Sequence, residues 1–380
     1  MAIVLGALLG LAAPQQAVAM KPLCDGFIRI VTWMMPFILF LLVSSAAAGL
    51  RQHRQGAGLT LKALSWFQAM TWLAVLIGTV SALAMNLGSE QGPAPGVHGQ
   101  IAGALANVTA MLSASRAVHV MLAGIACGLL CGRSARLRQG LERGWQGCHA
   151  LFRLVLRFTP LAAFSAVAFT VGRYGAVSLW PMFKFLAIVH LACGLFVTLV
   201  LNTTLRWLGV PLWSLLRHLR QELVLVLTTG ASLAALPGLA VKLEQLGCRR
   251  ETTRLILTAG YTFNLSGSVL YLTCAVLFLI GQAHIALTTT DVLTVMALVG
   301  LGSLGSTSVA GSSFLTLVAT LQILGLGSVE GLGLLLGVER LMKCRLLTNV
   351  LGNCVACLVV NHWQGTLTQP TLRRALGLTP

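Results

Sequence analysis

Apolar runs long enough to cross a lipid bilayer recur along almost the whole chain, and they restrict the possible folds more than any other feature. Hydrophobic residues make up 57% of the 380 positions, charged residues only 9%, and the mean hydropathy is +0.86. A soluble globular domain does not reach these values. The runs leave no room for a separate soluble domain, so the sequence predicts one all-α, polytopic membrane domain over residues 1–380.

Six apolar runs precede residue 220, and each is predicted to form a membrane helix: Ala2–Ala19, Val31–Leu50, Leu64–Leu87, Ile101–Leu130, Leu151–Val171 and Leu179–Leu201. The first run ends in Ala-Val-Ala, which resembles a signal-peptide cleavage site. It lacks a positively charged start, however, and another apolar run follows at once. We therefore interpret it as a membrane helix.

Basic residues are concentrated in alternate connections between these runs. The net charge of +17 comes from 26 Lys and Arg against 9 Asp and Glu. Clusters occur at Arg51–Arg54, Arg133–Arg143, Arg206–Arg220 and Arg373–Arg374. By the positive-inside rule, these connections and both termini are predicted to be cytoplasmic. Because membrane topology accounts for the basic charge, nucleic acid is not a predicted partner.

Beyond Arg220 the apolar segments are interrupted by small polar residues, in Leu227–Gly238, Tyr261–Ser268 and Gly300–Ser313. Irregular backbone at membrane depth is tolerated only where it is buried in protein or lines a cavity. Surface loops are a weaker interpretation, since uncharged apolar sequence continues on both sides. Broken helices and doubled-back segments are typical of transporter sites, where half-helix amino termini face anions and unwound carbonyls hold cations.

The last long apolar stretch, Glu330–His362, predicts a helix of roughly 50 Å with a polar face near its middle. Arg345, Asn349 and Asn353 recur every four residues, so they share one side of that helix. A charge at membrane depth normally faces a protein interior or a watery cavity. Two interpretations stay open: Arg345 binds a carboxylate through its planar fork, or it pairs with backbone or Glu339 and only holds the bundle together.

Several other classes of function find little support. The ten cysteines lie mostly inside apolar segments, as small packing residues do, and Cys354 and Cys357 occur within a predicted membrane helix. No His-Glu zinc motif and no Gly-x-Ser-x-Gly elbow occurs. The sequence therefore predicts that the chain is not an enzyme and that it needs no cofactor beyond a coupling cation.

Three motifs carry a resemblance to a known family: GYTFNLSGSVLYLT, GSTSVAGSSFLTLVATL and ERLMKCRLLTNVLGN. They resemble the last third of the dicarboxylate/amino acid:cation symporters, and bacterial C4-dicarboxylate transporters in particular. The resemblance implies a glutamate-transporter-like elevator fold, with eight transmembrane helices, two re-entrant hairpins and a homotrimer in the bacterial inner membrane. It implies a scaffold mainly within residues 1–220, a site-bearing core mainly within 221–363 and a cytoplasmic tail at 364–380.

The resemblance also implies the elements and residues of the site. It assigns hairpins to Glu222–Leu243 and Val292–Leu326, a broken seventh helix to Arg254–Ile280 and an eighth helix after them. Implied substrate-binding residues are Arg345, Asn349, Ser268, Ser232, Gly305, Ser306, Thr307, Ser308 and Val309. Implied cation-binding residues are Gly260, Thr262, Asn264, Ser266, Ser303, Asn349 and Asn353.

The chain departs from the family pattern at three places. Ser266 and Ser268 stand where the family carries Asp and Thr, and the serine-rich first hairpin tip is reduced to Gly230–Ser232. One residue is missing between Gly337 and Asn349. Two hypotheses follow: symport of C4-dicarboxylates (succinate, fumarate, malate) or acidic amino acids with Na+ or H+, or a regulatory relative that has lost transport.

Overall fold

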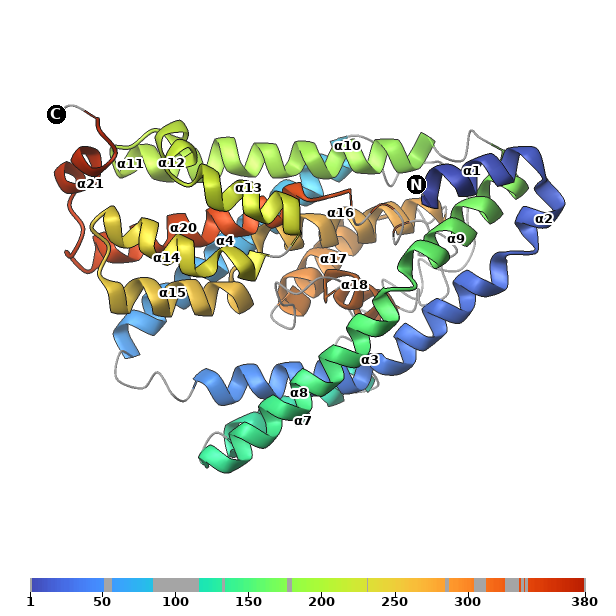
Figure 1. Ribbon diagram of the computed structural model, residues 1–380, viewed down its shortest axis with the longest axis horizontal. Coiled ribbons are helices and arrows are strands. Elements are labelled where there is room, and N and C mark those ends of the chain that lie inside the picture. The colour runs from blue at the N-terminus through green and yellow to red at the C-terminus, as the bar shows by residue number, and fades with distance from the viewer. Residues whose placement is uncertain are drawn as a thin grey trace.

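The structure is a computed structural model that describes residues 2–50, 57–84, 116–131, 134–175, 180–230, 232–283, 287–303, 312–324, 335, 338 and 341–378. Within these ranges the chain forms helices and turns and no strand, so the all-helical prediction is confirmed there (Figure 1). The tip of the second hairpin, Gly305–Val309, and Glu339 lie outside the described residues.

The amino-terminal part contains α1 (Ala2–Ala12), α2 (Pro14–Val18), α3 (Lys21–Leu50), α4 (Ala57–Ala84), α7 (Arg116–Cys131), α8 (Ala135–Leu156), α9 (Thr159–Tyr174) and α10 (Trp180–Leu195). A π-helical segment, Phe196–Leu201, joins α10 to α11 (Asn202–Trp207). The remainder contains α12 (Leu212–His218), α13 (Arg220–Thr229), a 3₁₀ turn (Ser232–Ala235), α14 (Leu236–Gln245), α15 (Arg250–Phe263), α16 (Ser266–Gln282), α17 (Thr289–Gly302), α18 (Ser312–Ile323), α20 (Cys344–Trp363) and α21 (Gln369–Ala375).

Four described stretches are long and apolar enough to cross a membrane: Leu61–Ala84, Trp180–Trp207, Arg250–Gln282 and Cys344–Trp363. Two shorter apolar helices, Pro160–Arg173 and Thr289–Gly302, accompany them. These stretches agree with the predicted multi-pass membrane protein. The total of eight transmembrane helices stays a prediction.

Two predicted spans are interrupted next to prolines. The run Ala2–Ala19 folds as α1 and α2, with a nonhelical Ala13 (φ −141°, ψ 71°) directly before Pro14. The prediction of one helix over Leu151–Val171 is wrong, because the boundary between α8 and α9 divides it just before Pro160. Proline lacks a backbone N–H, so neither Pro14 nor Pro160 can donate the hydrogen bond that would continue the preceding helix. Pro14 also disfavours the helical conformation at Ala13.

The continuous helix predicted over Glu330–His362 is also wrong. Residues 341–343 form a turn, and α20 begins only at Cys344. Residues 335 and 338, which precede this turn, are helical, so the stretch is divided at 341–343. Arg345 therefore lies in the first turn of α20 and not in the middle of a longer helix.

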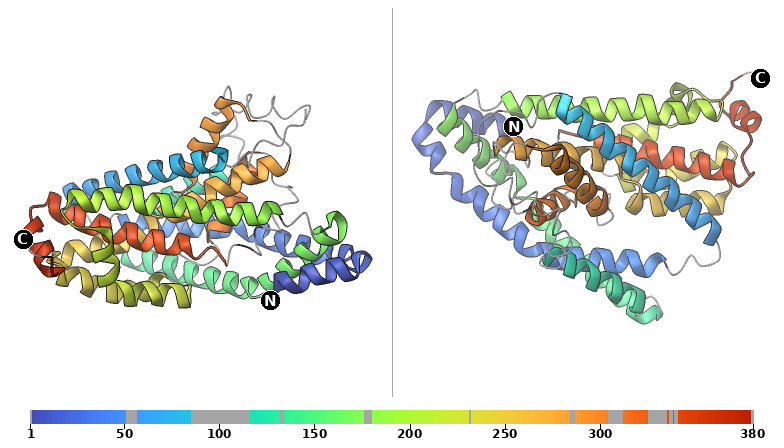
Figure 2. Two further views of the ribbon diagram at one scale, coloured as in Figure 1. Left: turned by 90° about the horizontal axis from the view of Figure 1, so that it is seen from above. Right: turned by 180° about the vertical axis from the view of Figure 1, so that it is seen from behind.

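Helix α16 forms the centre of the packed core. Every residue from Ser266 to Gly281 is buried, and α4, α10, α17, α18 and α20 pack around this helix. A second group, α1, α2, α3, α7, α8 and α9, packs mainly within itself and lies beside the core, with its long helices oblique to the core helices in Figure 1 (Figures 1 and 2). The polar face of α20 is consequently held against a helix that is buried from Ser266 to Gly281.

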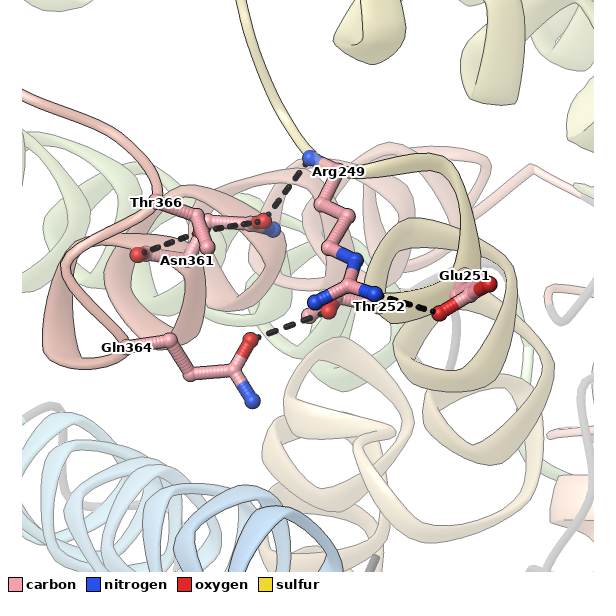
Figure 3. Close-up of polar contacts among 6 residues, drawn as sticks. All are labelled: Arg249, Glu251, Thr252, Asn361, Gln364 and Thr366. Atoms are coloured by element: carbon pink, nitrogen blue, oxygen red, sulfur yellow. Dashed lines mark hydrogen bonds and ion pairs between the residues drawn. The ribbon is translucent and has the colours of Figure 1, made fainter.

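One end of the bundle gathers the chain's carboxyl terminus, the start of α15 and the connection between α11 and α12 (Figure 1). There the Arg249 amide donates to Asn361 Oδ1 at 2.9 Å, and Thr252 Oγ1 donates to Gln364 Oε1 at 2.9 Å. Thr366 Oγ1 donates to the Asn361 carbonyl oxygen at 2.9 Å, and Arg249 pairs with Glu251 at 3.0 Å (Figure 3). The bonds from Arg249 and Thr252 fasten the start of α15 to the end of α20.

Candidate substrate and cation site

The site is organised around a break between α15 and α16. Helix α15 ends at Phe263, and the backbone leaves the helical region at Asn264 (φ −123°, ψ 72°) and Leu265 (φ −109°, ψ 46°) before α16 starts at Ser266. This break lies within Arg254–Ile280, where a broken helix was predicted. It leaves the first backbone N–H groups of α16 without partners inside their own helix.

Asn349 of α20 caps the broken end of α16. Its Oδ1 accepts hydrogen bonds from the backbone amides of Gly267 at 2.8 Å and Ser268 at 3.2 Å. Its Nδ2 donates to Ser268 Oγ at 3.0 Å. Both residues are almost fully buried, so these bonds satisfy groups that water does not reach. Two predicted substrate-binding residues, Asn349 and Ser268, are therefore in direct contact.

A second polar cluster lies one turn farther along α20. Asn264 Nδ2 donates to Asn353 Oδ1 at 2.9 Å, and Ser266 Oγ donates to Asn264 Oδ1 at 3.4 Å. Gly260 faces the same carboxamide so closely that an added Cβ would overlap Asn353 Oδ1. Asn353 Nδ2 is buried and has no hydrogen-bond partner among the described residues. The structure thus brings together four predicted cation-binding residues around neutral oxygens.

Arg345 occupies the start of α20, next to the start of α16. The residue is 6% exposed, and its guanidinium carbon lies 5.2 Å from the centroid of the Tyr271 ring. This distance is within the range of a cation–π contact, which strengthens when the groups are desolvated. Tyr271 is itself fixed by Phe185, at a centroid separation of 6.2 Å. The aromatic ring therefore orients a buried cation beside two helix amino termini, a setting that favours an anion.

The backbones of α16 and α20 lie close together at Gly267. A Cβ added at this position would overlap the carbonyl oxygen of Arg345 and come within 2.8 Å of Thr348 Cβ. Only glycine allows the α16 backbone to lie against α20 here. The short distance is what lets Asn349 reach the α16 amides.

The first hairpin, α13 to α14, contacts the site from the side. Its turn passes through Gly230 (φ 65°), and the Ser232 carbonyl accepts a hydrogen bond from Tyr261 Oη at 2.8 Å. Lys343, directly before α20, donates to the Leu227 carbonyl at 2.7 Å. Ser232 Oγ is buried without a hydrogen-bond partner in the described part of the chain. The hairpin tip is thereby tied to both α15 and α20.

The remaining predicted residues are only partly placed. Thr262 lies in the last turn of α15, and Ser303 Oγ donates to the Gly300 carbonyl at 2.7 Å within the second hairpin. Gly305, Ser306, Thr307, Ser308 and Val309 lie outside the described residues. Tyr271 and Lys343 were not predicted as site residues. Tyr271 is one turn after Ser268, so the helical spacing could have indicated it, whereas the Lys343 contact joins segments far apart in sequence.

Comparison with known proteins extends these observations. The model of the sodium:dicarboxylate symporter family matches residues 1–363. The chain is 36% identical to C4-dicarboxylate transport protein 1 of Ralstonia nicotianae, over 99% of this chain and 94% of the relative. It is 36% identical to the C4-dicarboxylate transport protein of Laribacter hongkongensis, over 99% of this chain and 90% of the relative. It is 34% identical to the C4-dicarboxylate transport protein of Solibacter usitatus, over 100% of this chain and 94% of the relative.

These matches span the broken helix, both hairpin regions and the polar face of α20. The family consists of symporters, so the prediction that this chain is not an enzyme is confirmed. The chain belongs to the sodium:dicarboxylate symporter family.

Proposed function

We propose that this protein is a secondary active symporter that moves C4-dicarboxylates such as succinate, fumarate and malate across a bacterial inner membrane together with Na+ or H+. The observation that carries this proposal is the buried guanidinium of Arg345 between the starts of α16 and α20. Acidic amino acids are the alternative substrates, since they also present two carboxylates. The names of the curated relatives support the C4-dicarboxylates.

In this proposal Arg345 binds one substrate carboxylate in two-point contact, because its fork matches the two oxygens. Asn349 and Ser268 contribute polar groups from the adjoining helix ends. Ser232 approaches from the first hairpin, and Gly305–Val309 from the second. To contact substrate, Asn349 exchanges part of its capping bonds with α16 for bonds to the ligand, so substrate binding is coupled to the geometry of the broken helix.

Substrate binding by the purified protein tests the proposed substrate class. Succinate, fumarate and malate are each expected to raise the thermal unfolding midpoint, because a ligand that binds only the folded state stabilises it. Monocarboxylates such as butyrate are the control and are expected to have no effect. Stabilisation by aspartate and glutamate without stabilisation by succinate would contradict the proposed substrates and favour the acidic amino acids.

The coupling cation is proposed to bind at the second polar cluster, near Asn264, Asn353, Ser266 and the backbone around Gly260. A hydroxyl at Ser266 offers a lone pair but no net charge, and burying a cation without compensating charge is costly. The proposed site therefore binds Na+ weakly, with few ions per cycle or with protons as the driving ion. Thr262 and Ser303 belong to a second proposed cation position with Ser306.

Ser266→Asp is expected to strengthen the Na+ dependence of succinate uptake, because it adds a buried carboxylate beside Asn264. The Na+ concentration that gives half-maximal uptake is expected to fall at least about tenfold. This change corresponds to about 1.4 kcal/mol of Na+ binding free energy. Ser266→Asn, which adds bulk without charge, is the matched control. Steep multi-ion Na+ activation in the unmodified protein would contradict the weak-site account.

The proposed transport cycle uses an elevator motion within a homotrimer. The moving part is proposed to comprise the first hairpin, α15–α16, the second hairpin and α20, together with α4 and α10 because these pack on α16. The group α1–α3 with α7–α9 is proposed to be the static scaffold. Both termini are proposed to be cytoplasmic.

Single added cysteines test this orientation in intact cells. Arg136→Cys and Arg374→Cys are expected to resist an impermeant maleimide, whereas Thr289→Cys, at the start of α17, is expected to react. The unmodified protein gives the background, to which Cys248 contributes little, since burial raises the pKa of its thiol to about 12. Labelling of Arg136→Cys from outside would overturn the topology.

A regulatory relative without transport is the second candidate function. It is favoured by Ser266, which replaces the family's carboxylate, and by the hydrogen bonds that Asn349 and Asn264 already make within the protein. It predicts binding of a dicarboxylate without net uptake. The comparison of binding and uptake therefore separates the two candidates.

A further inference from the structure

A basic cleft lies at the base of the first hairpin, away from the site described above. It has a volume of about 290 Å³ and is lined by Arg217, His218, Arg220, Gln221 and Lys242. The lining comes from the end of α12, the start of α13 and the last turn of α14. A water molecule occupies about 30 Å³ of liquid, so the cleft has room for a group of several heavy atoms.

The cleft carries uncompensated positive charge. No carboxylate forms an ion pair with Arg217, Arg220 or Lys242 in the part of the chain that the structure describes. The acidic residues on the same helices are turned elsewhere: Glu222 is 9% exposed, and Glu244 lies 3.9 Å from both Arg250 and Arg254. His218 adds no negative charge to the cleft, and its Nε2 donates to the Lys242 carbonyl oxygen at 3.1 Å. An anion is the ligand that such a lining favours.

The surroundings of the cleft indicate where that anion comes from. Trp213 is 73% exposed and lies one helical turn before Arg217, while Val224 is 57% exposed and lies one turn after Arg220. Val241, next to Lys242, is 54% exposed. Apolar side chains that border a basic cleft match a lipid, with its headgroup in the cleft and its acyl chains along the apolar surface, better than a small soluble anion.

We propose that this cleft binds the phosphate-bearing headgroup of an anionic phospholipid. Arg217, Arg220 and Lys242 contact the phosphate, and the exposed side chains at the helix surfaces contact the acyl chains. Basic clefts between membrane helices bind acidic lipid headgroups by this combination of charge and burial. Because the cleft lies at the base of the first hairpin, the bound lipid holds α12, α13 and α14 together.

Native mass spectrometry of the purified full-length protein with added phosphatidylglycerol or phosphatidylcholine tests this proposal. The variant R217Q/R220Q/K242Q is expected to bind phosphatidylglycerol on the order of 100-fold more weakly, since each basic residue contributes about fivefold. Phosphatidylcholine binding is expected to stay unchanged. R217K/R220K keeps the charge and is expected to retain phosphatidylglycerol binding.

The matched control is R136Q/R138Q/R143Q, which removes the same charge from α8 outside the cleft and is expected to bind phosphatidylglycerol normally. Equal losses in both triple variants, or no loss in the cleft variant, would overturn the proposal. Displacement of the lipid by millimolar inorganic phosphate or succinate would assign the cleft to a soluble anion and overturn the lipid assignment. If the cleft variant elutes as an aggregate, R217Q and K242Q alone are each expected to show about a fivefold loss.

Discussion

Replacing Arg345 with alanine is expected to lower succinate uptake at least about 30-fold while the protein still reaches the membrane. Arg345 is 6% exposed, so a carboxylate that it binds is largely removed from water. Truncating one partner of a buried, hydrogen-bonded charge pair costs about 2–5 kcal/mol, and 2 kcal/mol corresponds to roughly 30-fold. Uptake of radiolabelled succinate, normalised to the amount of protein in the membrane, measures this effect.

Arg345→Lys is the matched variant, because it keeps a positive charge but loses the planar fork. It is expected to retain more uptake than Arg345→Ala, with weaker succinate binding. A purely structural role gives a different pattern, in which Arg345→Ala lowers the unfolding temperature but leaves the affinity for succinate unchanged. That pattern would show that Arg345 only holds the helix bundle together and does not bind substrate.

Gly267→Ala is expected to lower transport strongly too, but for a steric reason. The added Cβ would overlap the carbonyl oxygen of Arg345, and backbone atoms cannot move aside as a flexible side chain can. Helices α16 and α20 must then separate, which weakens the capping bonds from Asn349. Overpacking of this kind costs about 1–3 kcal/mol, and uptake and the unfolding midpoint both report it.

Gly194→Ala is the control for this substitution. Gly194 is helical and exposed in α10, and an added Cβ would have no neighbour within 4 Å. Alanine is the better helix former by about 1 kcal/mol, so unchanged or slightly raised stability is expected. If Gly267→Ala keeps the uptake and unfolding midpoint of Gly194→Ala, the close packing is not needed for function.

Much of the fold could be predicted because membrane helices satisfy their own backbone hydrogen bonds, which makes local hydropathy informative. The break before Ser266 could be predicted because small polar residues in Tyr261–Ser268 interrupt an apolar run. The bends at Pro14 and Pro160 were missed because averaging hydropathy over a long window gives a single proline little weight. The turn before α20 was missed as well, because Leu341 and Met342 continue the apolar pattern of the stretch.

Of the site, the sequence could predict only which residues share a face of one helix, because helical spacing relates residues of the same helix. The four-residue repeat of Arg345, Asn349 and Asn353 places them on one face of α20, and each of these side chains is buried. Their partners come from another helix, so the spacing could not indicate that Asn349 caps α16 or that Arg345 stacks on Tyr271. The Lys343 contact with Leu227 likewise depends on how the first hairpin folds back.

The most direct test of the proposed function is uptake of radiolabelled succinate into proteoliposomes that contain only the purified protein. Inward gradients of Na+ or of protons are imposed separately, and Arg345→Ala proteoliposomes serve as the control. Symport predicts accumulation above the external succinate concentration with at least one gradient, and no accumulation with Arg345→Ala. Succinate binding without accumulation under either gradient would contradict symport and favour the regulatory relative.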